Sequence, residues 1–155
     1  MRRGISFEIP NEYGSFLGEV LKPINITEFI WRIGGEESYF VEDDKLGEPL
    51  FLEEIHEMDG LFLKGFLEDN TYYLIFADLK AHPKGKNPAN IETYEEFLNS
   101  DCELVLLVVD SVYFTIYCKD RDKLESLYNN AKLKGFDDLQ YITDENDTRT
   151  RLSVW

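Results

Sequence analysis

The stretch LVLLVVDSVYFTIYC, residues 104–118, contains two almost wholly apolar runs, Leu104–Val109 and Val112–Cys118. Runs with so few polar side chains are typical of strands whose two faces are both covered by protein. Asp110 and Ser111 separate the runs and are expected to form a two-residue turn. The pattern therefore predicts a hairpin at the centre of a sheet.

Weaker strand and helix signals surround this hairpin. Ile5, Phe7 and Ile9 alternate with small or polar residues, which is the period of a half-buried strand. Three further hairpins are expected, each made of two strands and a turn. Their strands are 30–33 with 38–41, 61–67 with 71–79, and 139–143 with 148–154, and the turns between them lie at Gly34-Gly35, 68–70 and 144–147. Helices are expected over 13–21, after the capping box Thr93-Glu96, and from Asp120 to a C-cap at Gly135. Residues 42–59 are either a short helix from Pro49 or irregular.

These elements predict one α+β domain over residues 1–155. Because most strands are joined by short hairpins, we expect a mainly antiparallel sheet with about three helices packed on one side.

The composition limits the kinds of partner. With 31 acidic and 16 basic residues, the chain has a net charge of −15, which repels nucleic acids and anionic membranes. A basic protein is a permitted partner. Glu8 and Pro10 interrupt the N-terminal region too early for a signal peptide, so we expect a cytoplasmic protein. Two cysteines, Cys102 and Cys118, are too few for a disulfide scaffold, and we expect both as free thiols.

The segment Glu36–Asp59, here called the acidic segment, holds ten acidic residues and a single base, Lys45. Such a concentrated field steers association with a basic partner, although many charge runs do no more than interact with water. If the segment binds a partner, the candidate contact residues are Glu36, Glu37, Glu42, Asp43, Asp44, Glu48, Glu53 and Glu54.

A small basic region is the counterpart of the acidic segment. Lys80, Lys84 and Lys86 lie between Asp78 and Glu92, where no other acid occurs, and they are candidates for binding an anion or for docking on the acidic segment. Asp78, Lys80 and His82 alternate and form a weak candidate for acid–base catalysis. Their alignment requires one continuous strand, and we expect the strand to end before His82.

Two patterns resemble metal sites and fail on spacing. His56 lacks a second histidine four residues later, where Gly60 stands. The loop from Asp144 has Arg149 at the glycine position of a calcium loop and Trp155 at the position of its bidentate glutamate. The sequence therefore predicts no metal and no cofactor.

Three stretches, RGISFEIPNEYG (3–14), YLIFADLK (73–80) and YITDEN (141–146), resemble a family of small acidic uncharacterised proteins from Bacillus-like bacteria. The resemblance implies a bacterial cytoplasmic setting and transfers no activity or site. In size and composition alone, the chain is also similar to toxin-neutralising immunity proteins.

Two main functional hypotheses follow. The first is a protein-binding, immunity-like domain, not an enzyme, that uses the acidic surface against a basic partner. The alternative is a small enzyme, or a protein that binds a small molecule or an anion, with a site near Asp78, Lys80 and His82. A self-associating structural domain is a third possibility, and the sequence does not indicate the oligomeric state.

Overall fold

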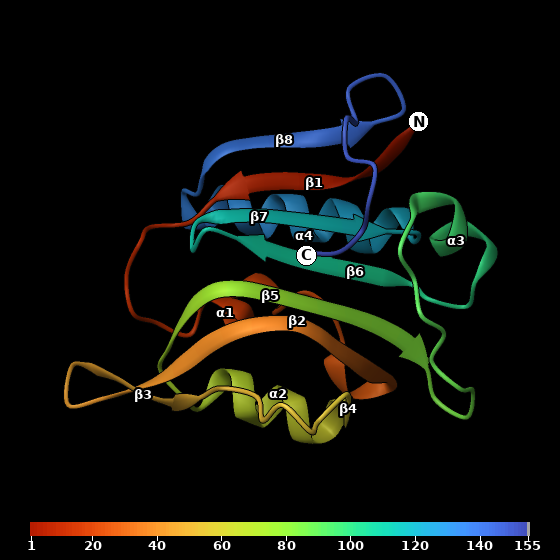
Figure 1. The fold of residues 1–155 in the computed structure, drawn as a ribbon. Coiled ribbons are helices and arrows are strands. Elements are labelled where there is room, and N and C mark those ends of the chain that lie inside the picture. The colour runs from red at the N-terminus through yellow and green to blue at the C-terminus, as the bar shows by residue number, and fades with distance from the viewer. Residues whose placement is uncertain (155) are drawn as a thin grey trace.

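The computed structural model describes residues 1–154, with the side chains of residues 35 and 36 left out. Within that part of the chain, eight antiparallel strands form one sheet in the order β3-β2-β5-β6-β7-β1-β8, with β4 also paired to β2 (Figure 1). The strands are β1 Arg2–Glu8, β2 Phe29–Glu42, β3 Lys45–Pro49, β4 Glu57–Asp59, β5 Tyr72–Pro83, β6 Leu104–Val109, β7 Tyr113–Cys118 and β8 Asp137–Thr143. The α-helices are α1 Phe16–Val20, α2 Gly60–Glu68, α3 Tyr94–Asn99 and α4 Arg121–Lys134, and Ile26–Glu28 forms a 3₁₀ turn. The α+β class and the antiparallel sheet are confirmed.

The predicted central hairpin is at the centre of the sheet. β6 lies between β5 and β7, and alternate side chains of β6 enter two different apolar clusters. The turn differs from the prediction, because Val109 pairs with Tyr113 and the loop therefore has three residues, Asp110–Val112. Asp110 and Ser111 both have positive φ angles, of 51° and 71°. The extra turn residue shifts the register by one, so that Leu104 faces Cys118.

Helices cover both faces of the sheet, not one face as the sequence suggested. α1, α2 and α4 pack in the larger cluster with Leu106 and Val108. Phe97 of α3 packs on the other face with Val105 and Leu107. The capping predictions for α3 and α4 are confirmed, since the Thr93 hydroxyl accepts the Glu96 N–H and the Asp120 carboxylate accepts two N–H groups.

The expected hairpin around Gly34-Gly35 is wrong. β2 continues through this dipeptide and pairs with β5 from Phe29 to Phe40, with a register shift between Gly34 and Glu37. Glycine suits such an irregularity because it has no side chain to pack. The Gly34-Gly35 dipeptide therefore corresponds to a bulge in β2 and not to a turn.

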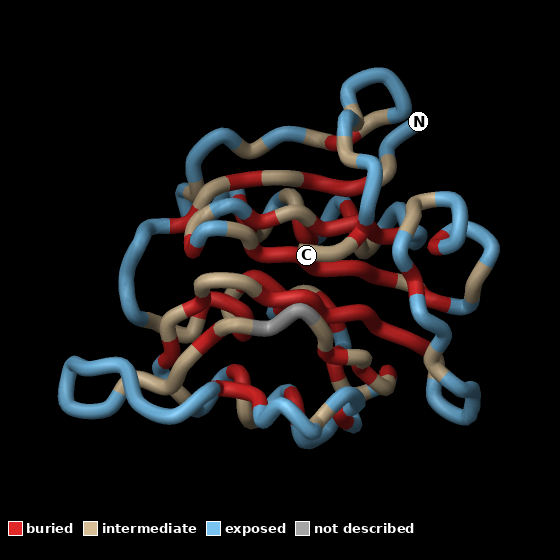
Figure 2. Tube along the Cα trace, in the orientation of Figure 1, coloured by how far each residue is buried: buried red, intermediate tan, exposed pale blue. Residues whose placement is uncertain are grey.

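The turn lies further along the chain, in a region expected to be a short helix or irregular. Glu42 pairs with Lys45, and Asp43 and Asp44 have positive φ angles of 51° and 61°. Asp tolerates this conformation, which the two-residue turns of hairpins require. The β2–β3 hairpin extends away from the body of the molecule (Figures 1 and 2).

The predicted strand 61–67 is also wrong, because these residues form α2. Leu63 and Leu67 are fully buried one helical turn apart, and the Asp59 carboxylate caps the helix by accepting the Leu61 N–H. Gly60 is essential to the packing, since a Cβ atom there would collide with the carbonyl oxygen of Ile26. A short apolar run cannot be assigned to helix or strand by periodicity alone.

The C-terminal segment 148–154 does not form the predicted strand. It crosses the face opposite α4, where Leu152 is fully buried with Val105 and Tyr117 (Figure 1). The segment therefore acts as cover for the sheet. Among the described helices, none is both long enough and apolar enough to span a membrane.

Candidate functional site

The acidic segment forms the end of β2, all of β3 and β4, and the loop between β3 and β4. Residues 42–49 are all exposed, and we call this hairpin tip the acidic arm (Figure 2). Of the predicted partner-binding residues, Glu42, Asp43, Asp44 and Glu48 lie on the arm. Glu53 and Glu54 lie exposed on the following loop and Glu37 is half-buried in β2, while the Glu36 side chain lies outside the described residues.

The carboxylates of this segment make few ion pairs, although Glu57 faces Arg32 across the β2–β4 pair. Within the described side chains, Asp59 is its one acid in an ion pair, at 3.4 Å from Lys84 Nζ. The Tyr39 hydroxyl donates to Glu37 at 3.5 Å. The remaining described acids of the segment make no ion pair, so their field is available to a partner.

A groove of about 420 Å³ opens beside the arm, between β2 and the loop that follows β3. Its lining combines the apolar side chains of Tyr39, Phe51, Leu52 and Ile55 with the acid Glu53. Phe51 is buried and its ring stacks on Phe66 of α2 with 5.5 Å between centroids, whereas Leu52 is 56% exposed. The groove thus joins apolar contact area to an acidic border.

The candidate catalytic row lies on one continuous strand, so the expectation that the strand ends before His82 is wrong. β5 extends to Pro83, and Asp78, Lys80 and His82 share the face opposite Leu79 and Ala81. All three side chains of the row are buried, with exposures of 4%, 6% and 2%.

Asp78 and Lys80 satisfy each other, because the Lys80 ammonium donates to the Asp78 carboxylate at 2.6 Å. Burial raises the pKa of Asp78, against the opposing effects of Lys80 and of the Val154 backbone. Burial also lowers the pKa of His82 to about 4, with Arg32 and Lys80 adding to the effect. The Nε2 atom of His82 is buried without a hydrogen-bond partner. His82 is thus a neutral, enclosed imidazole, poorly placed to exchange protons with a substrate.

A second cavity, here called the inner cleft, lies above Asp78 and Lys80 and has a volume of about 290 Å³. Its walls also include Arg32 of β2, Glu92 and Arg151, and His82 does not line it. Arg32 and Arg151 were not among the residues predicted for this site. Arg32 comes to this place because it faces Lys80 directly across the β2–β5 pair. The groove and the inner cleft share Ile33, Gly34 and His56 as a common wall.

The three lysines of the predicted anion site do not converge. Lys80 is buried in the sheet, Lys84 pairs with Asp59, and Lys86 Nζ lies 3.3 Å from Asp101. The contact of Lys84 agrees with the alternative that this loop docks on the acidic segment of the same molecule.

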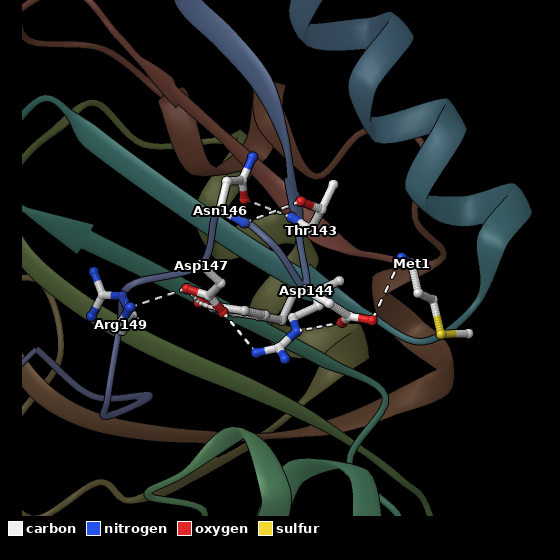
Figure 3. Close-up of polar contacts among 8 residues, drawn as sticks. Met1, Thr143, Asp144, Asn146, Asp147 and Arg149 are labelled. Atoms are coloured by element: carbon white, nitrogen blue, oxygen red, sulfur yellow. Dashed lines mark hydrogen bonds and ion pairs between the residues drawn. The ribbon is translucent and has the colours of Figure 1, made fainter.

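The loop after Asp144 is held by cations of the protein itself (Figure 3). Arg3 donates to Asp144 at 2.8 Å and to Asp147 at 3.2 Å, and the terminal amino group of Met1 lies 3.5 Å from Asp144. The hydrogen bond from Arg3 lowers the pKa of Asp144. The Arg149 N–H also donates to Asp147, so this carboxylate anchors the start of the C-terminal segment. These contacts support the interpretation of the loop as a turn.

Cys102 and Cys118 are buried free thiols in different apolar clusters. Burial raises the pKa of both thiols to about 11, which leaves them protonated at neutral pH. Their state in the cell stays a prediction, which titration of unreduced, denatured protein with a thiol reagent can test.

Comparison with known proteins identifies the family. Residues 2–153 match the model of a protein family of unknown function, DUF2691, and the chain belongs to this family. It is 49% identical over 154 residues to the uncharacterised protein YncE of Bacillus subtilis strain 168, covering 99% of this chain and all of that relative. The predicted resemblance is therefore confirmed. No solved structure matches the chain.

Proposed function

We propose that this protein is a protein-binding domain whose acidic arm and adjoining groove bind a basic segment of a partner protein. The observation that carries the proposal is the combination of exposed, unpaired carboxylates with a largely apolar groove at the same edge of the molecule. Immunity-like neutralisation of a basic protein is one activity of this kind.

The two parts of the surface have different roles in this proposal. The carboxylates of the arm act at long range and increase the rate of encounter with a basic partner. Leu52, Ile55 and Phe51 supply apolar contact area, which slows dissociation once the partner is seated. A ligand that combines Lys or Arg with an apolar anchor fits both parts.

The cytoplasm is the proposed location. The buried, protonated thiols of Cys102 and Cys118 are compatible with a reducing compartment.

The proposal is tested by comparative affinity capture from cells of a bacterium that encodes the protein. The bait is the wild-type chain or a variant with Glu42→Gln, Asp43→Asn and Asp44→Asn. We expect the wild type to retain at least one basic protein that this variant loses.

A matched control carries Glu12→Gln, Glu125→Gln and Glu145→Gln. These three acids are also exposed and lie outside the acidic segment, so the control has the same net charge as the arm variant. It should retain the partner. Loss of the partner by both variants would assign the binding to net charge alone, and equal capture by all three baits would contradict the role of the arm.

A further inference from the structure

The inner cleft has more cations than its own carboxylates neutralise. Arg32 and Lys80 face each other on neighbouring strands, where like charges repel. Lys80 is paired with Asp78 at 2.6 Å. Arg32 is half-buried, and it makes no ion pair with any described residue. On its other side Arg32 faces the exposed acid Glu57 of β4 without forming an ion pair, so within the described part of the chain its guanidinium is available to a ligand.

The other described charges of the walls are already paired with each other. Arg151 Nη2 lies 3.8 Å from Glu92 Oε1, so these two side chains balance each other. Among the described residues that line the cleft, Arg32, Lys80 and Arg151 thus stand against Asp78 and Glu92, a net of +1 in a chain of net charge −15. A local excess of positive charge in so acidic a protein requires an explanation.

The cleft is built from segments that hold one another in place. The Leu152 N–H donates to the Glu92 carbonyl at 2.8 Å, and the Leu152 side chain is fully buried. The backbone of Val154, close to Asp78, opposes the rise in the pKa of this carboxyl that burial causes. Two strands form the floor, so the cavity exists before any ligand enters.

We propose that the inner cleft binds a small molecule carrying an oxyanion group, a carboxylate or a phosphate, with Arg32 as its main contact. The guanidinium of arginine presents a planar fork of N–H donors that matches both groups. Lys80 uses one of its three donors on Asp78 and can direct another to the same anion. A volume of about 290 Å³ lies at the lower end for ligand pockets and suits a compact compound.

The surrounding electrostatics agree with this assignment. After burial itself, the charges of Arg32 and Lys80 are the largest causes of the lowered pKa of His82. A positive field strong enough to disfavour a buried imidazolium also attracts an anion. The site is independent of the acidic arm, because none of the carboxylates replaced in the arm variant lines it.

The test is a titration of the full chain with sodium phosphate and, separately, with sodium acetate, at constant ionic strength set by sodium chloride. Amide chemical shifts and thermal stability are both followed. We expect saturable shifts around residues 32, 80, 92 and 151–153, and a rise in melting temperature with at least one anion. The anion that binds more tightly, phosphate or acetate, identifies which oxyanion group the cleft prefers.

Arg32→Gln should weaken this binding about 10- to 100-fold, the effect of removing one charge-assisted contact. Arg121→Gln is the matched control, because Arg121 is exposed on α4 outside the cleft, and it should bind like the wild type. Arg32→Lys keeps the charge without the fork and should show an intermediate affinity.

The anion-free melting temperature separates a binding role from a structural one. Because Arg32 faces the cation Lys80 on one side and the acid Glu57 on the other, Arg32→Gln should melt close to the wild-type temperature when no anion is present. A melting temperature far below that of the wild type without anion, unchanged binding in Arg32→Gln, or no saturable binding of either anion would each overturn the proposal.

Discussion

The acidic arm and the Asp78–Lys80–His82 row are both rich in charge, and they differ in what surrounds the charges. The arm exposes every residue from 42 to 49 to water and pairs none of its carboxylates. The row is at most 6% exposed, and its two charged members are bonded at 2.6 Å. Removing a charge from water costs several kcal/mol unless a partner replaces the water, whereas an exposed charge costs little.

This difference teaches where each region can act. The arm does not need its charges for folding, so they are available for recognition. The row is buried, so its charges must be matched, and at the neighbouring Arg32, which makes no ion pair with a described residue, we propose a bound anion.

Breaking the buried pair should have the largest effect. Asp78→Ala leaves Lys80 buried without its counter-charge and should lower the free energy of unfolding by about 3–5 kcal/mol. Denaturant unfolding monitored by circular dichroism measures this loss. The double variant Asp78→Leu with Lys80→Met should recover most of it, because it leaves no buried charge. A loss in Asp78→Ala below about 1 kcal/mol, the range of exposed pairs, would mean that the pair is solvated.

His82 should make the protein sensitive to moderate acid. Its pKa is lowered to about 4 in the folded protein, against about 6.5 in an unfolded chain. The unfolded state therefore binds a proton first, so stability is complete above pH 6.5 and decreases as the pH falls towards 4. The full difference corresponds to about 3 kcal/mol.

The measurement compares the pH dependence of unfolding in the wild type and in His82→Leu, which cannot titrate. The comparison cancels the titration of the many carboxylates, and the variant should lose less stability between pH 6.5 and 4. His56→Gln is the control, because His56 is the other histidine and is exposed. Parallel curves for the wild type and His82→Leu would contradict the buried, neutral imidazole.

Neutralising the arm should have the smallest effect on stability. The variant with Glu42→Gln, Asp43→Asn and Asp44→Asn should change the free energy of unfolding by less than about 0.5 kcal/mol, as is usual for exposed sites. Asn tolerates the positive φ angles of the turn as well as Asp does. A destabilisation comparable to that of Asp78→Ala would show that the arm carboxylates are structural.

The sequence predicted the elements whose signals are local. The apolar runs of β6 and β7 and the caps at Thr93, Asp120 and Gly135 all lie within a few residues of the structures that they specify. The errors arose where packing between distant segments decides the outcome. Gly34 fits either a turn or a bulge, and its pairing with β5 selects the bulge.

The same reasoning explains what could be predicted of the sites. The charges of the acidic segment are a property of composition and were visible without coordinates. The alternation of Asp78 and Lys80 indicated a shared face. Arg32 and Arg151 were not predictable, because they reach the inner cleft through the β2–β5 pairing and through the C-terminal segment.

The most direct test of the proposed function is the association rate of a captured basic partner with the wild-type chain at low and at high salt, measured by stopped-flow fluorescence. At about 1 M salt the Debye length falls to about 3 Å, so steering by the arm is screened. We expect association to slow strongly as salt rises, and the arm variant to associate slowly at both salt concentrations with a smaller change in dissociation rate. An association rate that is the same at low and high salt, or a partner that is itself acidic, would contradict the account.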